Sequence, residues 1–277
     1  MKRCKRYSGQ RFVYDLNIAF KLLDILADSS IEEKSNINLA DYLKMGAPKV
    51  QAFMNYIEIC DLIDNRQLTD FGTYILKFKE YPEIYQPLLY YKLCRGWENG
   101  GHFYYSRVVN NILYDRYFSA DNCIDNSEIK EKILDYKYEY VSMDEKLVST
   151  VTKGISSAEG FGYLRILEKE SNSRSKYKIN SYKPHYLVCA YILYDIWPDN
   201  IGTVSFDDII FNEYNLGRIF FLTEKEIIPI LSKLHQINLI KIEDKAGLKQ
   251  IAKNPKISGN EILEEICNEY SIDTVSN

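Results

Sequence analysis

The chain has 277 residues, of which 46% are hydrophobic and 27% are charged, and its formal net charge is −4. This composition is typical of a globular protein, and the length favours two or three compact units over a single core. The net charge argues against a chain coated in nucleic acid, although a local basic surface is compatible with it. No apolar run is long enough to span a membrane, and the basic start MKRCKR is not followed by a signal-peptide core, so we expect a cytoplasmic protein.

The cysteines and histidines carry no metal-binding or redox motif. Six cysteines are scattered along the chain without a close pair, and none of the three histidines has a partner at metal-ligand spacing. Metal sites and redox pairs generally need two ligands within a few residues. We therefore expect reduced and mostly buried thiols, no bound metal and no cofactor.

Residues 1–80 predict a winged helix-turn-helix domain. A basic arm over residues 2–11 either grips phosphate or is a solvated terminus. Apolar residues then recur at helical spacing, with Gly46 closing the first helix of a central pair and Pro48 opening the second. The expected order is a helix over 14–27, the helix pair over 39–60, an extended piece over 67–70 and a helix over 71–78.

The second helix of such a pair is the one that can enter a DNA major groove. Its polar face carries Lys49, Gln51 and Asn55. Asparagine and glutamine can pair with adenine, and lysine can contact phosphate or guanine. Between residues 39 and 80, however, five basic side chains face six acidic ones, so the charge gives no basic footprint. Protein contact by this helix is the open alternative.

Residues 81–200 predict an aromatic-rich helical domain. Helices are expected over 84–94 and 102–117, and a buried one over 184–197. The segment Asp125–Lys130 resembles the acidic end of a nuclease metal site, but no companion aspartate ends a hydrophobic strand, and Ser127 before Glu128 favours a helix start. A basic hairpin near 163–180 offers Arg174 and Lys176 to a phosphate backbone, or is an ordinary solvated hairpin.

Residues 201–277 predict a second winged-helix-like domain. A short helix over 205–212 and an amphipathic helix over 224–236 precede two strands over 239–242 and 248–251, and an acidic terminal helix follows. Between residues 215 and 256 there are eight basic and four acidic side chains, so this is the more plausible nucleic-acid face. The candidate phosphate contacts are Arg218, Lys225, Lys233, Lys241, Lys245 and Lys249.

Six short motifs occur in the order and spacing of a bacterial family. They are Tyr7–Phe12 (YSGQRF), Met45–Val50 (MGAPKV), Leu68–Gly72 (LTDFG), Tyr191–Trp197 (YILYDIW), Leu216–Leu222 (LGRIFFL) and Ala246–Gln250 (AGLKQ). The chain thus resembles a domain-of-unknown-function family encoded beside PAPS-reductase-like sulfurtransferases in DNA phosphorothioation and related phage-defence gene clusters. The resemblance implies a DNA-linked defence role and no particular reaction. The family's opening motif has a histidine where this chain has Gln10, which either removes a chemical group or keeps a hydrogen bond.

The sequence therefore predicts a mainly α protein with minor β content and winged helix-turn-helix units at both ends. We expect a non-catalytic DNA-binding or adaptor subunit of a DNA-modification or phage-defence system. Its expected partners are double-stranded DNA and protein subunits, among them a PAPS-reductase-like sulfurtransferase, with no membrane. The alternatives are a protein-interaction scaffold without DNA contact, and a nuclease or other enzyme built on carboxylates such as Asp207, Asp208 and Asp244, which also fit helix starts and turns.

Overall fold

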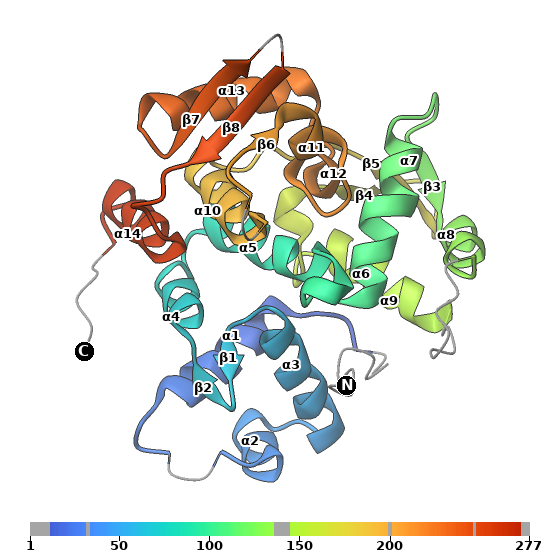
Figure 1. The fold of residues 1–277 in the computed structure, drawn as a ribbon. Coiled ribbons are helices and arrows are strands. Elements are labelled where there is room, and N and C mark those ends of the chain that lie inside the picture. Colours follow the sequence, from blue (N-terminus) through green and yellow to red (C-terminus); the bar gives the residue numbers. More distant parts are fainter. Residues whose placement is uncertain (1–11, 32–33, 136–144, 199–200, 246–247, 273–277) are drawn as a thin grey trace.

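The computed structural model describes residues 12–31, 34–135, 145–198, 201–245 and 248–272 (Figure 1). The basic arm and Gln10 lie outside these residues. Helices dominate the fold, and three small antiparallel sheets accompany them in the described residues, so the predicted mainly α class is confirmed. Within the same residues, no helix is both long and apolar enough to cross a membrane.

The N-terminal unit contains the predicted helices and the extended piece in the predicted order. Its elements are α1 (Leu16–Ala27), α2 (Asn36–Leu43), α3 (Ala47–Ile59), β1 (Ile63–Asp64), β2 (Gln67–Leu68) and α4 (Asp70–Lys77). Of these, β1 is an additional strand that the sequence did not predict. Side chains of Asp15, Ser35 and Thr69 accept hydrogen bonds from the first-turn backbone N–H groups of α1, α2 and α4. The residue that ends α2 in the left-handed conformation is Lys44, with φ 51°, and not Gly46, which is extended at the start of α3.

The middle of the chain is helical, with one small sheet. Its elements are α5 (Pro82–Cys94), the 3₁₀ turn η2 (Trp97–Asn99), α6 (Phe103–Arg107), the π-helix η3 (Val108–Leu113), α7 (Tyr114–Tyr117), β3 (Cys123–Asp125), α8 (Asn126–Ile133), α9 (Glu145–Ser156), the 3₁₀ turn η4 (Gly162–Leu164), β4 (Leu167–Lys169), β5 (Lys176–Ile179) and α10 (Tyr186–Ile196). The predicted basic hairpin is β4–β5, and β3 joins it as an unpredicted third strand against β5.

The C-terminal unit combines short helices with a long hairpin. It contains β6 (Val204–Ser205), α11 (Phe206–Phe211), α12 (Leu216–Phe220), α13 (Glu224–Gln236), β7 (Ile240–Lys245), β8 (Leu248–Lys253) and α14 (Gly259–Glu269). The strand order is β6-β8-β7, so the strand before the helices pairs with the last strand of the hairpin. Reciprocal hydrogen bonds between Ser205 and Asp208 start α11, and the Glu226 carboxylate accepts from the backbone N–H and hydroxyl of Thr223 at α13.

Buried side chains from all three parts form one continuous hydrophobic cluster. Helices α5 and α10 lie side by side at its centre, with the N-terminal unit at one end of the molecule and the β7–β8 hairpin at the other (Figure 1). Helix α14 packs on α10 and returns to α4, where the Asn260 amide donates to Asp70 and the Tyr74 hydroxyl to Glu264, both at 3.1 Å. The chain therefore closes on itself.

The contact between α11 and α12 requires a glycine. A Cβ atom on Gly217 would lie 2.0 Å from the carbonyl oxygen of Ile210, whereas one on Gly202 would meet nothing within 4 Å. We predict that Gly217→Ala lowers the free energy of unfolding by about 1–3 kcal/mol, as expected for overpacking. Urea unfolding measures this, with Gly202→Ala as control, expected within about 0.5 kcal/mol of the wild type. Equal effects of the two substitutions would contradict the close contact.

His102 is buried at the start of α6, where its ring stacks on Tyr56 with centroids 5.5 Å apart. Burial lowers the pKa of His102 to about 4. The unfolded chain takes up this proton near pH 6.5 and the folded chain only near pH 4. Folding stability contributed by neutral His102 is therefore present above pH 6.5 and is lost as the pH falls toward 4.

We predict that the free energy of unfolding falls by roughly 3 kcal/mol across this window because of His102 alone. His102→Phe should flatten that part of the pH dependence in urea titrations, since the apolar ring keeps the packing without a titrating group. Gly202→Ala, which adds no titrating group and meets nothing within 4 Å, serves as the control and should leave the pH dependence unchanged. A slope between pH 4 and 6.5 that is as steep in His102→Phe as in the wild type would contradict the assignment.

Candidate functional site

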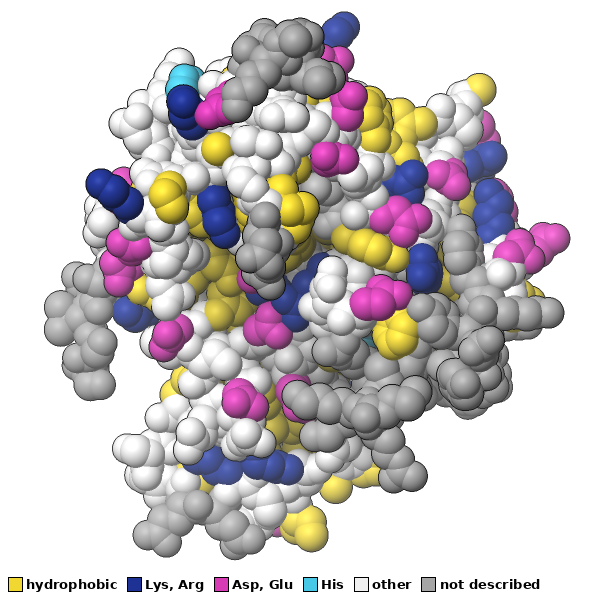
Figure 2. Space-filling model, viewed as in Figure 1, with side chains coloured by type: hydrophobic (Ala, Val, Ile, Leu, Met, Phe, Trp, Pro, Cys, Tyr) yellow, Lys and Arg dark blue, Asp and Glu magenta, His cyan; other side chains and the backbone are white. Residues whose placement is uncertain are grey.

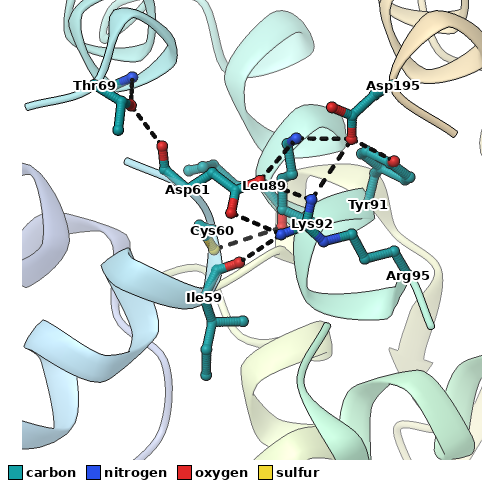
Figure 3. Close-up of polar contacts among 10 residues, drawn as sticks. Ile59, Cys60, Asp61, Thr69, Leu89, Tyr91, Lys92, Arg95 and Asp195 are labelled. Carbon is teal, nitrogen blue, oxygen red and sulfur yellow. Dashed lines mark hydrogen bonds and ion pairs between the residues drawn. The ribbon is translucent and has the colours of Figure 1, made fainter. Parts of the chain in front are cut away.

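A cluster of opposite charges joins α3, α5 and α10 (Figure 3). Lys92 lies on α5 with its side chain only 2% exposed, and its Nζ atom lies 3.0 Å from Oδ2 of Asp61 and 2.7 Å from Oδ2 of Asp195. Arg95, directly after α5, places Nη1 2.7 Å from Oδ2 of Asp61 and 3.6 Å from Oδ2 of Asp195. The Tyr91 hydroxyl donates to the same Asp195 oxygen at 2.6 Å.

Local backbone geometry holds the cluster in place. Asp61 follows α3 in the left-handed conformation, with φ 58°, and its carbonyl oxygen accepts from the Thr69 hydroxyl at 2.5 Å. The Arg95 Nη2 atom donates to Oδ1 of Asp61 at 2.8 Å and to the Ile59 carbonyl at 3.2 Å. The Lys92 ammonium also lies over the rings of Phe71 and Tyr191, at 5.0 and 5.4 Å from their centroids. Each buried cation thus has partners, as burial of charge requires.

The Asp61 carboxyl and the Arg95 guanidinium are both ionised at neutral pH. Burial alone would raise the pKa of Asp61, but the hydrogen bonds and charge of Arg95, followed by those of Lys92, lower it. Burial alone would lower the pKa of Arg95, and the hydrogen bonds and charge of Asp61 raise it instead. Burial, reinforced by Asp195, raises the pKa of Tyr91. The carboxylate and guanidinium therefore stay charged and the phenol keeps its proton, which favours a structural and electrostatic role over proton transfer.

A cavity of about 810 Å³ lies beside the cluster, between α5, α10 and the α11–α12 segment. Its polar lining includes Tyr91, Arg95, Asn99, Asp195, Asp208, Asn212, Glu213 and Asn215. The contacts made to Asp195 in the described part of the chain all use Oδ2. One wall is strained, because Tyr214 has φ 68°, a conformation that a bulky residue rarely adopts.

The π-helix supports this strained wall. Asn110, fully buried within it, accepts from the backbone N–H of Tyr214 at 2.9 Å and donates to the Cys94 and Ser106 carbonyls at 2.8 and 2.9 Å. The Asn110 carbonyl accepts from Nη1 of Arg218 at 2.8 Å. The irregular turn therefore ties the end of α5 to the cavity wall and to α12.

The structure places Arg218 away from its predicted role as a phosphate contact. Its Nε atom donates to the Phe211 carbonyl at 2.9 Å, and its guanidinium lies over the Tyr114 ring, 4.3 Å from the centroid. Together with the bond to Asn110, these contacts hold the side chain against the protein. Contact with DNA would require them to break.

The predicted base-reading face of α3 is also engaged within the protein. The Asn36 amide donates to Gln51, and Gln51 donates in turn to the Oδ1 atom of Asn55 at 2.8 Å. Asn55 is only 8% exposed. Lys49 is half-buried beside a small cavity that Asp15 and Glu159 also line. Contact of Gln51 and Asn55 with DNA bases would therefore require these hydrogen bonds to break.

The predicted lysines of the C-terminal unit lie at the surface. Lys225 and Lys233 are exposed on α13, and Lys241 and Lys249 are exposed on the hairpin. The register pairs Lys241 with Ala252 and Lys249 with Asp244, which puts the two lysines on opposite faces of the hairpin. The side chain of Lys245 lies outside the described residues. Lys253, which the sequence analysis did not name, is exposed on the same face as Lys249.

The basic β4–β5 hairpin offers less free charge. Arg174 is exposed, whereas Lys176 lies 3.7 Å from the Glu170 carboxylate. On the face of the molecule in Figure 2, lysine and arginine side chains are interspersed with aspartate and glutamate. Charge on that face therefore gathers into no extended basic surface.

Sequence reasoning missed the Lys92 cluster, although two signals pointed to it. Lys92 interrupts the apolar and aromatic run of α5, and Asp195 interrupts that of α10. Charged residues are seldom buried unless they are paired, so two lone charges in apolar helices predict a buried ion pair. Among the described residues, no group of three or more His, Cys, Asp or Glu side chains comes together in a way that could hold a metal ion.

Comparison with known proteins assigns the fold. Residues 139–267 match a family described as "Protein of unknown function (DUF4007)". The "Magnesium ion-bound SspB crystal structure" superimposes with a TM-score of 0.72 at 14% identity, over 96% of this chain and 88% of that one. The "SspB crystal structure" gives 0.69 at 12% identity with the same coverage. The comparison with curated proteins found no match. This chain therefore shares the fold of SspB.

The charge cluster leads to a prediction about stability. Asp195→Asn keeps the shape of the side chain but removes the charge that faces Lys92, so we expect the free energy of unfolding to fall by about 3 kcal/mol, the lower end for a broken buried pair. Asp24→Asn, which breaks the exposed pair between Asp24 and Lys79 (2.8 Å), should cost less than about 1 kcal/mol. Thermal and urea unfolding measure both. Equal losses would show that the cluster is no stronger than a surface pair.

Proposed function

We propose that this chain is a DNA-binding adaptor subunit of a bacterial DNA-modification or phage-defence system. The motifs shared with the family from phosphorothioation-type gene clusters support that setting. The observation that carries the DNA-binding part is the set of exposed lysines on α13 and the β7–β8 hairpin. In this proposal, the C-terminal unit binds DNA and the N-terminal unit binds a protein partner.

The element order of the C-terminal unit supports a winged-helix interpretation. A strand, three helices and a hairpin follow one another, and the first strand pairs with the last. In winged helix-turn-helix proteins the helix before the hairpin is the one that enters the major groove. Lys225 and Lys233 are eight residues apart on α13, or about 12 Å along the helix, a spacing close to the groove's width. On the hairpin, Lys249 is exposed close to the β7–β8 turn, whereas Lys253 lies over the rings of Tyr194 and Trp197, 5.9 Å from each centroid.

The N-terminal unit favours a protein partner over DNA. In α3, the side chains of Gln51 and Asn55 form hydrogen bonds within the protein. Helix α2 exposes two large apolar side chains, Ile37 at 69% and Tyr42 at 59%. Burial of exposed apolar side chains of this size against a partner lowers the free energy of the complex. Given the resemblance, a PAPS-reductase-like sulfurtransferase is the first partner to test by co-purification.

The proposed function is non-catalytic. One of the two SspB structures is described as bound to a magnesium ion. In the present chain, Asp61 and Asp195 both contact Lys92, so these carboxylates already have a cation. We expect plasmid DNA to stay intact with the purified chain in magnesium. Nicking in magnesium that stops with EDTA would overturn the non-catalytic part and leave DNA binding standing.

We predict that Lys225→Glu combined with Lys249→Glu weakens binding of duplex DNA of any sequence. Each lost phosphate contact removes about one unit from the slope of log K against log salt, so the double variant should lose about two. Fluorescence anisotropy with a labelled duplex at several salt concentrations measures both the affinity and the slope.

The matched control is Lys21→Glu with Lys153→Glu, a charge reversal at exposed lysines of α1 and α9. Both double variants change the net charge equally, so a loss confined to the first locates the interface. Equal losses would assign the binding to net charge alone. The absence of any duplex binding by the wild type at low salt would leave the protein-interaction scaffold as the function.

A further inference from the structure

A second cavity opens beside the exposed face of α13. Its volume is about 470 Å³, within the usual range for small-ligand sites. Helix α13 contributes the exposed residues Pro229 and Lys233 to the lining, together with the buried Ile230. The other lining residues come from the start of α5, the segment leading into α10 and the end of α14, and they are Glu83, Tyr182, Lys183, Pro184, His185, Tyr186 and Tyr270. The cavity thus adjoins the helix proposed to enter DNA.

Aromatic rings dominate the walls of this cavity, and each ring is held from behind. The Tyr186 hydroxyl donates to Glu269 at 2.6 Å, and the Tyr186 ring packs on His185 with centroids 4.4 Å apart. Tyr270 meets His185 and Tyr81 edge-on, with centroids 5.7 and 5.3 Å apart. Tyr182 packs against Phe220 at 6.2 Å. All three tyrosines are half-buried, so each ring is fixed in place while part of it remains accessible.

Two lysines lie at the rim of the cavity, Lys233 on α13 and Lys183 in the segment before α10. Lys233 is exposed with its Nζ atom 5.5 Å from the centroid of the Tyr186 ring, and Lys183 is exposed nearby. The opposing carboxylates are Glu83, which lines the cavity, and Glu269, which is engaged by Tyr186 and lies 3.4 Å from Nε2 of His185. The cavity therefore combines accessible rings with ammonium groups, and Lys233 belongs to both the cavity and the exposed face of α13.

We propose that this cavity accepts an unpaired nucleobase, which stacks on the tyrosine rings while Lys233 and Lys183 contact the flanking phosphates. Every base has a π-face, so stacking on aromatic side chains tolerates any sequence, and nearby lysines secure the backbone. The proposal rests on the proposed DNA binding and adds its substrate class, which is DNA with a bulged, extruded or single-stranded base. A proline-rich or aromatic peptide would use the rings but has no need of the two lysines.

The experiment compares three labelled DNAs by fluorescence anisotropy: a duplex, the same duplex with one bulged base, and a single strand of the same sequence. We expect the wild type to bind the bulged duplex and the single strand more tightly than the duplex. Tyr270→Ala should weaken binding of these two DNAs by about tenfold and change duplex binding by less than about twofold, since it removes a stacking ring and leaves the exposed lysines of α13 and the hairpin in place. Tyr270→Phe keeps the ring and should bind like the wild type.

Lys183→Gln provides a second variant, because an exposed lysine can be replaced without loss of folding. It should lower the salt slope for the bulged duplex by about one unit and leave the slope for the plain duplex unchanged. Tyr42→Ala, at a tyrosine that is 59% exposed on α2 and outside the cavity lining, is the matched control and should change nothing.

Two results would contradict the proposed base-binding role of the cavity and leave the proposed DNA binding unaffected. One is a wild type that binds all three DNAs equally, and the other is a Tyr270→Ala variant that weakens duplex and bulged DNA alike. Tyr270-dependent binding of a proline-rich peptide, without any preference for unpaired bases, would assign the cavity to a protein ligand and also overturn the proposal. If none of the three DNAs binds at low salt, the proposed function and the pocket fall together.

Discussion

The ammonium of Lys92 is the group around which the N-terminal unit and the central helices α5 and α10 meet. A lysine withdrawn from water is costly unless oppositely charged groups surround it, and its two carboxylate partners come from the end of α3 and from α10. The N-terminal unit and the middle of the chain thus each contribute a charge that the other needs. The cluster resists rearrangement because any relative movement of α3, α5 and α10 would strand a buried charge. Continuous apolar packing adds free energy of folding, while this cluster fixes the register between the packed helices.

Interactions within one segment could be predicted from the sequence. The helix starting after Ser205, the amphipathic helix after Thr223 and the buried helix over 186–196 all appear near their expected positions, because caps and apolar periodicity act over a few residues. Strand β3 escaped prediction because its partner β5 lies some fifty residues further on and only three residue pairs hold it. The π-helix escaped because the Asn110 side chain within it accepts a hydrogen bond from the backbone N–H of Tyr214, over a hundred residues away, and such a contact leaves no local signal.

For the candidate site residues too, local features could be predicted from the sequence and tertiary contacts could not. Lysines on α13 and the hairpin were found because surface charge can be counted from composition alone. Arg218, Gln51 and Asn55 looked equally available in the sequence, but tertiary contacts draw them inward. Polar residues on a predicted helix face therefore indicate a binding surface only once the neighbouring segments are known. The proposed adaptor role rests on the exposed lysines of α13 and the hairpin in one terminal unit and on the exposed apolar side chains of α2 in the other.

The return of α14 to α4 bears on how the two ends would cooperate. The hairpin and α2 lie at opposite ends of the molecule, and the hydrogen bonds from Asn260 and Tyr74 close the chain along one side (Figure 1). A protein joined to the N-terminal unit would then be carried on a rigid spacer and not on a flexible tether. The active site of that partner protein would then have a fixed orientation and a fixed distance relative to the bound DNA. Such a spacer would set the number of base pairs between the DNA site bound by the hairpin and the DNA site modified by the partner protein.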